Sequence, residues 1–527
     1  MTALNVTNMD DLDIELDIIG QQPFMVKLYT QISFCFPITD PSTHLAITNT
    51  LKDGLQRLSK SFPWVAGQVK DDGNGVFKIK PFEATPRLVV KDLRDDPSAP
   101  TMEGLRKAEF PMSMFDENKI APKKTLPIGP EYSPDDPVSV LIFQLNFIQG
   151  GLIFTVNGQH GCMDMTGQDE LIRLLSKACR DEAFTDQEIS TMNLDRKTIV
   201  PLLENYQLGP ELDHQIIKPP PTTEAPPTPP KASWAFFSFS PQALSELKDK
   251  ATQILDAGTK FVSTDDTLSA FIWQSVSRAR LASLDESTST LFCRAVDVRT
   301  QLDVPKNYPG ILQNMTYSVS KLSQIANEPL GIAASRLRSK LGRDDLRRRT
   351  QALVTYSQDQ ANRAGISVTA DANPPTDIML SSWAKLKCWE YDFGLGLGKP
   401  ESVRRPLFEP FESLMYLMPK RLDGEITAAL SLRDEDMDIL KSDEEWKSTL
   451  KTFLFTCTMD LSAMGFPGAL PDWSNLNILH RNTLPARAHF YSYPDQGSAL
   501  SFNREQGYFH SLNGTWKFHY DISPFEL

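Results

Sequence analysis

The sequence predicts a mixed α/β protein built from two lobes, and three observations lead to this prediction. Apolar strand-like segments alternate with amphipathic helix-like segments in both halves of the chain. A proline-rich stretch, 216–231, separates the halves, because its seven prolines in sixteen positions prevent both helices and sheet ladders. The chain of 527 residues is also long enough for two to four domains.

The clearest local structure in the first half is a β-hairpin. Residues 138–147 and 152–159 are apolar and strand-like, and Gln149, Gly150 and Gly151 between them form the turn. The other elements that we expect in this half are a buried strand at 22–38, a helix at 51–62 and a helix near 166–179.

The second half has the same mixed character. We expect an amphipathic helix at 265–281, strand-like pieces within 311–322, and a strand followed by a helix within 423–440. The domain boundaries that follow are an N-terminal lobe at 1–210, a linker at 211–233, a C-terminal lobe at 234–455 and a tail at 456–527.

Composition excludes several classes of partner. The net charge of −13 argues against nucleic-acid binding, which requires a basic face. The six cysteines are scattered without any CxxC pair, so we expect no metal site and no disulfide framework. Five acidic residues in 9–17 precede the first basic residue, unlike a signal peptide, and no apolar run reaches transmembrane length. We therefore expect a cytoplasmic monomer with no membrane partner.

The stretch DFGLGLGKP at 392–400 invites a nucleotide-binding interpretation, which fails on two counts. A protein kinase also needs an HRD sequence, and this chain has none. A P-loop needs Ser or Thr after its lysine, whereas Lys399 is followed by Pro400. The stretch is better explained as a glycine-rich loop with tight turns, in which Asp392 is an anchoring carboxylate.

His160 is the first candidate for chemistry. It follows the predicted strand 152–159, and a strand end holds a catalytic side chain rigidly. Asp164 comes four residues later, but this spacing alone favours a structural histidine. No HExxH pattern supports a metal, and no second histidine–acid pair supports Cys162 as a nucleophile.

His160 and the glycine-rich loop together change this interpretation. HGCMD at 160–164 and DFGLG at 392–396 resemble the two signature motifs of the BAHD acyltransferases, which use coenzyme A and are related in fold to chloramphenicol acetyltransferase. The resemblance is greatest to the fungal branch that includes trichothecene 3-O-acetyltransferases, and it covers residues from about 15 to about 450. Four further blocks resemble the family, at 51–69, 263–280, 294–302 and 381–400.

The resemblance implies a two-lobed chloramphenicol-acetyltransferase-like fold and a reaction. The enzyme would transfer an acyl group, expected to be acetyl, from acyl-CoA to a hydroxyl of a terpenoid or polyketide alcohol. His160 would be the general base for direct attack on the thioester, without an acyl-enzyme. Transfer to an amine, and a product without catalytic activity, remain alternatives.

The resemblance also assigns structural roles to the two motifs. Asp164 would point away from the substrate and hold its loop through a salt bridge. Asp392 would pair with Arg299 of the sequence VDVR, so that Gly394 and Gly396 belong to the scaffold rather than to the site.

Further residues match positions that contact substrates in the family. The Ser381 hydroxyl would lie beside the oxyanion of the tetrahedral intermediate, with packing as the alternative role. Trp383 would line the acceptor pocket. Ser263, Thr264 and Lys385 would approach the pantetheine and phosphates of acyl-CoA.

The tail has a different resemblance. Residues 472–527 are similar to the beginning of a family 2 β-galactosidase, through NTLPARAHFYSY at 482–493 and SLNGTWKF at 511–518. In that family these residues begin a sugar-binding β-sandwich, which needs about 100 residues. We therefore expect no glycosidase activity, and we interpret the tail as foreign sequence from a fused or mispredicted gene model.

Overall fold

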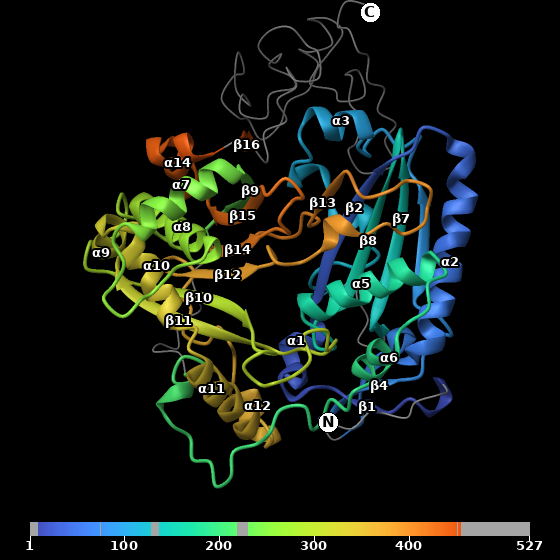
Figure 1. Ribbon diagram of the computed structural model, residues 1–527, viewed down its shortest axis with the longest axis horizontal. Helices are drawn as coiled ribbons and strands as arrows, with labels where there is room; N and C mark the ends of the chain where they lie inside the picture. Colours follow the sequence, from blue (N-terminus) through green and yellow to red (C-terminus); the bar gives the residue numbers. More distant parts are fainter. Residues whose placement is uncertain (1–8, 74, 128–135, 219–229, 451, 455–527) are drawn as a thin grey trace, which may run out of the picture. The chain divides into compact units, whose positions relative to one another are not determined.

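The structure is a computed structural model that describes residues 9–73, 75–127, 136–218, 230–450 and 452–454 (Figure 1). These residues belong to one compact unit that contains both predicted lobes. The middle of the predicted linker and the whole of the predicted tail lie outside the described residues.

The first lobe is built on a mostly antiparallel sheet. Within the described residues its strand order is β13-β2-β8-β7-β5. The predicted hairpin is confirmed, and Gly150 supplies the positive φ of 75° that its turn needs. The strands are β2 (Tyr29–Pro37), β5 (Arg87–Asp92), β7 (Leu141–Ile148), β8 (Gly151–Gln159) and β13 (Ser402–Arg404).

Helices α2 (His44–Ser61) and α5 (Met165–Cys179) cover one face of this sheet (Figure 1). Alternate side chains of β2, such as Ile32 and Phe34, join their core, while Gln31 and Ser33 point to the other face. The predicted strand at 22–38 is wrong in its first part. Pro23 starts the short helix α1 (Pro23–Lys27), because proline suits the first turn of a helix.

The second lobe contains a larger sheet. Its described strands follow the order β11-β10-β12-β14-β15-β9-β16. Helix α8 packs against α7, α9, α10 and α13. The strands are β9 (Ala232–Phe239), β10 (Ser289–Asp297), β11 (Gln313–Lys321), β12 (Ile378–Ser382), β14 (Leu414–Leu417), β15 (Ile426–Arg433) and β16 (Thr452–Leu454). The helices are α7 (Pro241–Thr252), α8 (Thr264–Arg280), α9 (Leu322–Asn327), α10 (Leu330–Ser339) and α13 (Asp434–Ser442).

Smaller elements complete the described unit. A second sheet beside the first has the order β1-β4-β3-β6. Its strands are β1 (Ile14–Glu15), β3 (Gln68–Asp71), β4 (Phe77–Lys80) and β6 (Val138–Ser139). The remaining helices are α3 (Met102–Lys107), α4 (Glu117–Ile120), α6 (Asp186–Met192), α11 (Arg343–Tyr356), α12 (Gln360–Ala364) and α14 (Glu444–Thr449), with short 3₁₀ turns between elements.

One segment of the second half returns to the first sheet. Strand β13 pairs antiparallel with β2, and Val403 is the partner of Phe34. Just before it, the ring of Phe393 packs edge-on against Phe34 and Phe154, with centroids 5.5 and 5.3 Å away. The glycine-rich loop is thereby anchored on the first lobe, and a piece of the second half completes the first sheet.

Candidate active site

His160 is the first residue after β8, and the strand fixes the position of its side chain. Its backbone N–H donates to the carbonyl of Leu28, 2.8 Å away. Its ring nitrogen Nδ1 lies 3.1 Å from the carbonyl oxygen of Met163. Because a carbonyl only accepts hydrogen bonds, Nδ1 carries the proton in this contact, and Nε2 keeps a lone pair. The imidazole therefore presents the nitrogen that a general base needs.

The surroundings also keep this imidazole neutral. Burial is the largest influence and lowers the pKa of His160. The hydrogen bond to Met163 and the charge of Asp164 raise the pKa, whereas the charge of Arg405 lowers it further. The residue as a whole is only partly buried. A neutral imidazole can accept a proton at pH 7.

The turn after His160 is held by side-chain and backbone contacts. Gln159 accepts from the backbone N–H of Cys162 at 2.9 Å, and its amide donates to the carbonyls of Met25 and Val26 at 2.9 and 2.7 Å. Burial raises the pKa of the Cys162 thiol to about 12. The thiol is therefore protonated at neutral pH, which agrees with its exclusion as a nucleophile.

Asp164 anchors the other end of the turn. It caps α5 by accepting from the backbone N–H of Gly167 at 2.9 Å. Both of its oxygens receive hydrogen bonds from the fully buried guanidinium of Arg299, at 2.8 and 2.9 Å, and one also accepts from the N–H of Leu312 at 2.8 Å. The predicted salt bridge of Asp164 is confirmed, and it joins the two halves of the chain.

The predicted pair between Asp392 and Arg299 is wrong. Arg299 gives its charged bonds to Asp164 and, at 2.9 Å, to Asp297. Asp392 instead accepts from the backbone N–H of Gly394 at 2.8 Å, and its own carbonyl accepts from Arg180. The Asp392 carboxylate thus stabilises a local turn, a role for which the short aspartate side chain is well suited.

The glycines of this loop take the conformations expected of tight turns. Gly394 and Gly396 have φ values of 65° and 74°, in the left-handed region that favours glycine. A Cβ on Gly394 would also lie 3.0 Å from the side chain of Arg180. Both glycines thus shape the loop, in agreement with a scaffold role.

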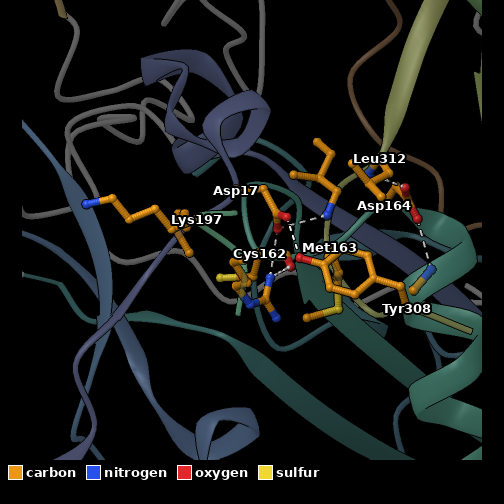
Figure 2. Close-up of polar contacts among 12 residues, drawn as sticks. Asp17, Cys162, Met163, Asp164, Lys197, Tyr308 and Leu312 are labelled. Carbon is orange, nitrogen blue, oxygen red and sulfur yellow. Dashed lines mark hydrogen bonds and ion pairs between the residues drawn. The ribbon is translucent and has the colours of Figure 1, made fainter. Parts of the chain in front are cut away.

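A second buried ion pair contacts the turn, and the sequence did not reveal it; Figure 2 shows its acidic member, Asp17, near Cys162 and Tyr308. Asp17 is 3.0 Å from Nη1 of Arg196, and the same nitrogen donates to the carbonyl of Cys162 at 2.6 Å. Asp17 also accepts from the hydroxyl of Tyr308 and, at 3.2 Å, from the N–H of Ile311. The pair therefore also holds the turn, through the carbonyl of Cys162.

Ser381 and Trp383 lie at and just beyond the end of β12. The Trp383 Nε1–H donates to the Ser381 hydroxyl at 3.2 Å, and its ring packs 5.0 Å from that of Tyr416. Within the described residues, no hydrogen bond joins Ser381 to His160. The structure thus groups Ser381 with Trp383 and leaves its role at the oxyanion a proposal.

Two of the residues expected near acyl-CoA lie at the start of α8. Ser263 caps the helix in a capping box with Asp266, and Thr264 is its first residue. The Ser382 hydroxyl donates to Asp265, which brings the end of β12 beside this helix terminus. Three residues later, Lys385 is exposed and has no ion-pair partner among the described residues. The first turn of α8 carries Asp265 and Asp266, so Lys385 is the group in this set whose charge suits a phosphate.

Two further observations concern metal binding and membrane-spanning helices in the described part. Its histidine, cysteine and acidic side chains form no group of three that could hold a metal ion. None of its helices is both long enough and apolar enough to cross a membrane.

Comparison with known proteins identifies the family. The sequence model described as the Trichothecene 3-O-acetyltransferase-like N-terminal domain matches residues 28–179, and that of the Transferase family matches residues 118–447. The chain therefore belongs to the Transferase family of acyltransferases and, at its N-terminal end, carries the domain of the trichothecene 3-O-acetyltransferase-like branch. It is an acyl-CoA-dependent acyltransferase, as the resemblance of its motifs predicted.

Two curated relatives are similar over nearly their whole length. Trichothecene 3-O-acetyltransferase TRI101 of Fusarium sporotrichioides is 68% identical over 456 residues, which cover 86% of this chain and 99% of the relative. O-acetyltransferase dmxR13 of a Cryptosporiopsis species is 53% identical, and the match covers 83% of this chain and 97% of the relative.

Solved structures support the two-lobed fold. TRI101 of F. sporotrichioides, complexed with coenzyme A and T-2, aligns with a TM-score of 0.81 and 66% identity, over 84% of this chain and all of that chain. Vinorine synthase aligns with a TM-score of 0.59 and 16% identity, over 86% of this chain and 96% of that chain. This match shows the fold alone. The predicted fold class is confirmed.

Proposed function

We propose that the chain transfers an acetyl group from acetyl-CoA to a hydroxyl of a secondary metabolite, with His160 as the general base. The observation that carries this proposal is the contact between Nδ1 of His160 and the carbonyl of Met163, which leaves Nε2 as an acceptor. The acceptor that we favour is a trichothecene-type terpenoid alcohol, because TRI101, at 68% identity, is named for this substrate.

The reaction follows from these groups. Nε2 of His160 takes the proton of the acceptor hydroxyl while its oxygen attacks the thioester carbonyl. The tetrahedral intermediate then collapses, the C–S bond breaks, and the proton returns from His160 to the departing CoA thiolate. Positioned bases of this kind contribute roughly 10²–10⁴-fold to the rate. No acyl-enzyme is needed, which agrees with the protonated thiol of Cys162.

The two substrates would approach through different elements. We assign acetyl-CoA to Ser263, Thr264 and Lys385, as the resemblance implies, and Lys385 supports this assignment as an exposed cation without an ion-pair partner in the described part. We assign the acceptor to the side of Trp383, with Ser381 as the candidate donor to the oxyanion.

The test is CoA release from acetyl-CoA, measured as free thiol, with a panel of terpenoid and polyketide alcohols and matched amines. We expect turnover with an alcohol, and a loss of at least about 10²-fold in His160→Ala. His214→Ala is the matched control, because His214 is partly exposed and pairs with Asp371 away from the motif. Turnover that survives in His160→Ala would overturn the role of the base, and turnover with amines alone would reverse the assignment of the acceptor.

We also propose that the protein works as a cytosolic monomer. The five described cysteines are all free and buried, which suits a reducing compartment. Light scattering in solution would then give the mass of one chain, and cell fractionation would recover the protein with the cytosol. A mass of two chains would contradict the monomer, and recovery in a membrane fraction would contradict the cytosolic location.

A further inference from the structure

The carbonyl that orients His160 lies between two anchored residues. Met163 supplies this carbonyl, which accepts from Nδ1 of the imidazole at 3.1 Å. The following residue, Asp164, is anchored through its side chain by the ion pair described above. The preceding residue, Cys162, is anchored through its backbone, because its carbonyl accepts from Nη1 of Arg196 at 2.6 Å. The orientation of the imidazole therefore depends on both anchors.

Arg196 is itself held firmly in place. It follows α6, and only 3% of the residue is exposed. Its guanidinium carbon lies 4.7 Å from the ring centroid of Trp64, a distance at which an aromatic face attracts a cation. The nitrogen that donates to Cys162 also donates to Asp17 at 3.0 Å. The carboxylate of Asp17 therefore aims this nitrogen at the turn.

Asp17 is in turn fixed by the segment before β11. It accepts from the hydroxyl of Tyr308 and, at 3.2 Å, from the backbone N–H of Ile311 (Figure 2). Only 1% of Asp17 and none of Tyr308 is exposed. These bonds place the carboxylate between the turn of His160 and the second half of the chain.

The N-terminal segment also contacts the turn at a second point, which involves no charge. Gly20 packs so closely on Gly161, the residue after His160, that a Cβ on Gly20 would lie 2.0 Å from the Gly161 carbonyl oxygen. A Cβ on Gly161 would lie 2.9 Å from the carbonyl oxygen of Gly20. Neither residue has room for a side chain, so the two backbones constrain each other.

We propose that Arg196 is a positioning residue for acyl transfer, and that Asp17 holds it so that the lone pair of His160 faces the acceptor hydroxyl. The inference rests on the proposed role of His160 as the base. Arg196 acts through the carbonyl of Cys162 and the turn that presents the carbonyl of Met163, without touching the reacting atoms.

A positioning role accounts for a charged pair at this place. Stability alone is a weak explanation, because replacing a whole buried ion pair by apolar groups is often neutral or stabilising. A charged donor, by contrast, makes a shorter and stronger bond to a carbonyl than a neutral one. The short bond to Cys162 therefore restrains the turn, and a shift of about 1 Å at a reacting group can cost roughly 10²-fold in rate.

The experiment compares kcat and KM of Arg196→Met with those of the wild type, using the full chain, acetyl-CoA and an alcohol that the wild type turns over. We expect kcat to fall roughly 10–100-fold, because the base is displaced. The KM values of both substrates should change little, because Arg196 is buried and assigned to neither substrate. An unchanged kcat in the folded variant would overturn the proposal.

Arg280→Met is the matched control. Arg280 is also buried, pairs with Asp436 at 3.3 Å and donates to the carbonyl of Asp377 at 3.0 Å, but it lies at the end of α8 in the second lobe. Both variants should lower the urea midpoint, because each leaves a buried carboxylate without its cation. Only Arg196→Met should lower kcat, and an equal loss of kcat in the two would contradict a positioning role.

A double variant separates positioning from stability. Asp17→Asn combined with Arg196→Met removes both charges, so the urea midpoint should rise above that of Arg196→Met alone. The carbonyl of Cys162 still lacks its charged donor, so kcat should stay low. If kcat returned together with the midpoint, Arg196 would contribute only stability. If Arg196→Met alone does not fold, as judged by circular dichroism, the double variant carries the same expectation for kcat.

A spectroscopic measurement tests the ring of His160 without turnover. In protein labelled with ¹⁵N-histidine, the signals of His160 are those that disappear in His160→Ala, and in the wild type they should show the proton on Nδ1. Arg196→Met should increase the fraction with the proton on Nε2, whereas Arg280→Met should not. The same pattern in Arg196→Met as in the wild type would overturn the proposal.

The outcomes also separate this proposal from the one on which it rests. Turnover that survives in His160→Ala would overturn the base itself, while a changed ring pattern in Arg196→Met would still show that Arg196 orients the imidazole. An inactive His160→Ala, together with an Arg196→Met that keeps both kcat and the ring pattern, would overturn only the role of Arg196.

Discussion

At the scale of single residues, the acid of the HGCMD motif does not orient the histidine directly. The ring of His160 is oriented by a backbone carbonyl, that of Met163, while Asp164 turns away and binds Arg299. The motif thus separates two tasks, because one side chain is the proposed base and the other fixes the turn that holds it. Its spacing reflects the length of the turn between β8 and α5.

Asp164→Asn tests this division at the residue scale. The change leaves the guanidinium of Arg299 buried with only the half-exposed Asp297 as a charged partner, and breaking a buried pair in this way costs about 3–5 kcal/mol. We expect a lower urea midpoint together with reduced turnover. Asp303→Asn is the control, because the ion pairs of Asp303 with Arg343 and Arg347 are on the surface and contribute little. Equal midpoints for the two variants would contradict the prediction.

The part of the site that could be predicted from sequence is the part with a local pattern. His160 and Asp164 lie in one turn, and the VDVR sequence pointed to Arg299. The predicted partner of Arg299 was wrong, because no local pattern in the sequence shows whether it binds Asp164 or Asp392. Asp17 was missed for a similar reason. It lies in an acidic run that looks solvent-exposed, and its partner Arg196 is far away in the sequence.

At the scale of elements, local signals predicted the pieces but not all of their pairings. The hairpin β7–β8 followed from apolar runs around glycines, and α2 from the spacing of its leucines, although it begins earlier, at His44. Strand β13 pairs with β2, which lies more than 360 residues earlier in the chain. Such pairing depends on the packing of Phe393 and Val403 against the first sheet, and no periodicity encodes it.

Gly167→Ala tests the contact between α5 and the segment before β11. In a helix, alanine is normally the better residue by about 1 kcal/mol. Here its Cβ would lie 2.0 Å from the carbonyl oxygen of Pro309, which is backbone and has to move. We expect a net loss of about 1–3 kcal/mol in the free energy of unfolding, measured in urea. We also expect slower turnover, because the shift would strain the hydrogen bond from the N–H of Leu312 to Asp164.

Gly258→Ala is the matched control at this scale. A Cβ on Gly258 would meet no atom within 4 Å, and its φ is not positive, so its stability should stay close to that of the wild type. If Gly167→Ala were as stable as this control, the close approach of α5 to Pro309 would not be a constraint of the fold.

At the scale of the whole molecule, the candidate site is a joint product of both halves. His160 and Asp164 come from the first half, Arg299 follows β10 in the second, and β13 of the second half is built into the first sheet. One buried ion pair, the hydrogen bonds of Tyr308 and Ile311 to Asp17, and one strand pairing therefore tie the turn of His160 to the second half. Separation of the two halves should therefore displace His160. We expect enzymatic activity to be lost in the same transition in which the body unfolds.

The tail at 456–527 gives the last prediction. It lies outside the described residues, the family match ends at residue 447, and its resemblance is to about half of a β-sandwich domain. We propose that it is foreign to the acyltransferase and contributes nothing to acyl transfer. Limited proteolysis of the full chain, followed by intact mass measurement, should place the earliest cuts within 456–527. The fragment that carries His160 should keep its acetyl-CoA turnover within about twofold, a change of less than about 0.5 kcal/mol. A tail as resistant as the body, or activity that falls in step with its removal, would instead make it a working part of the enzyme.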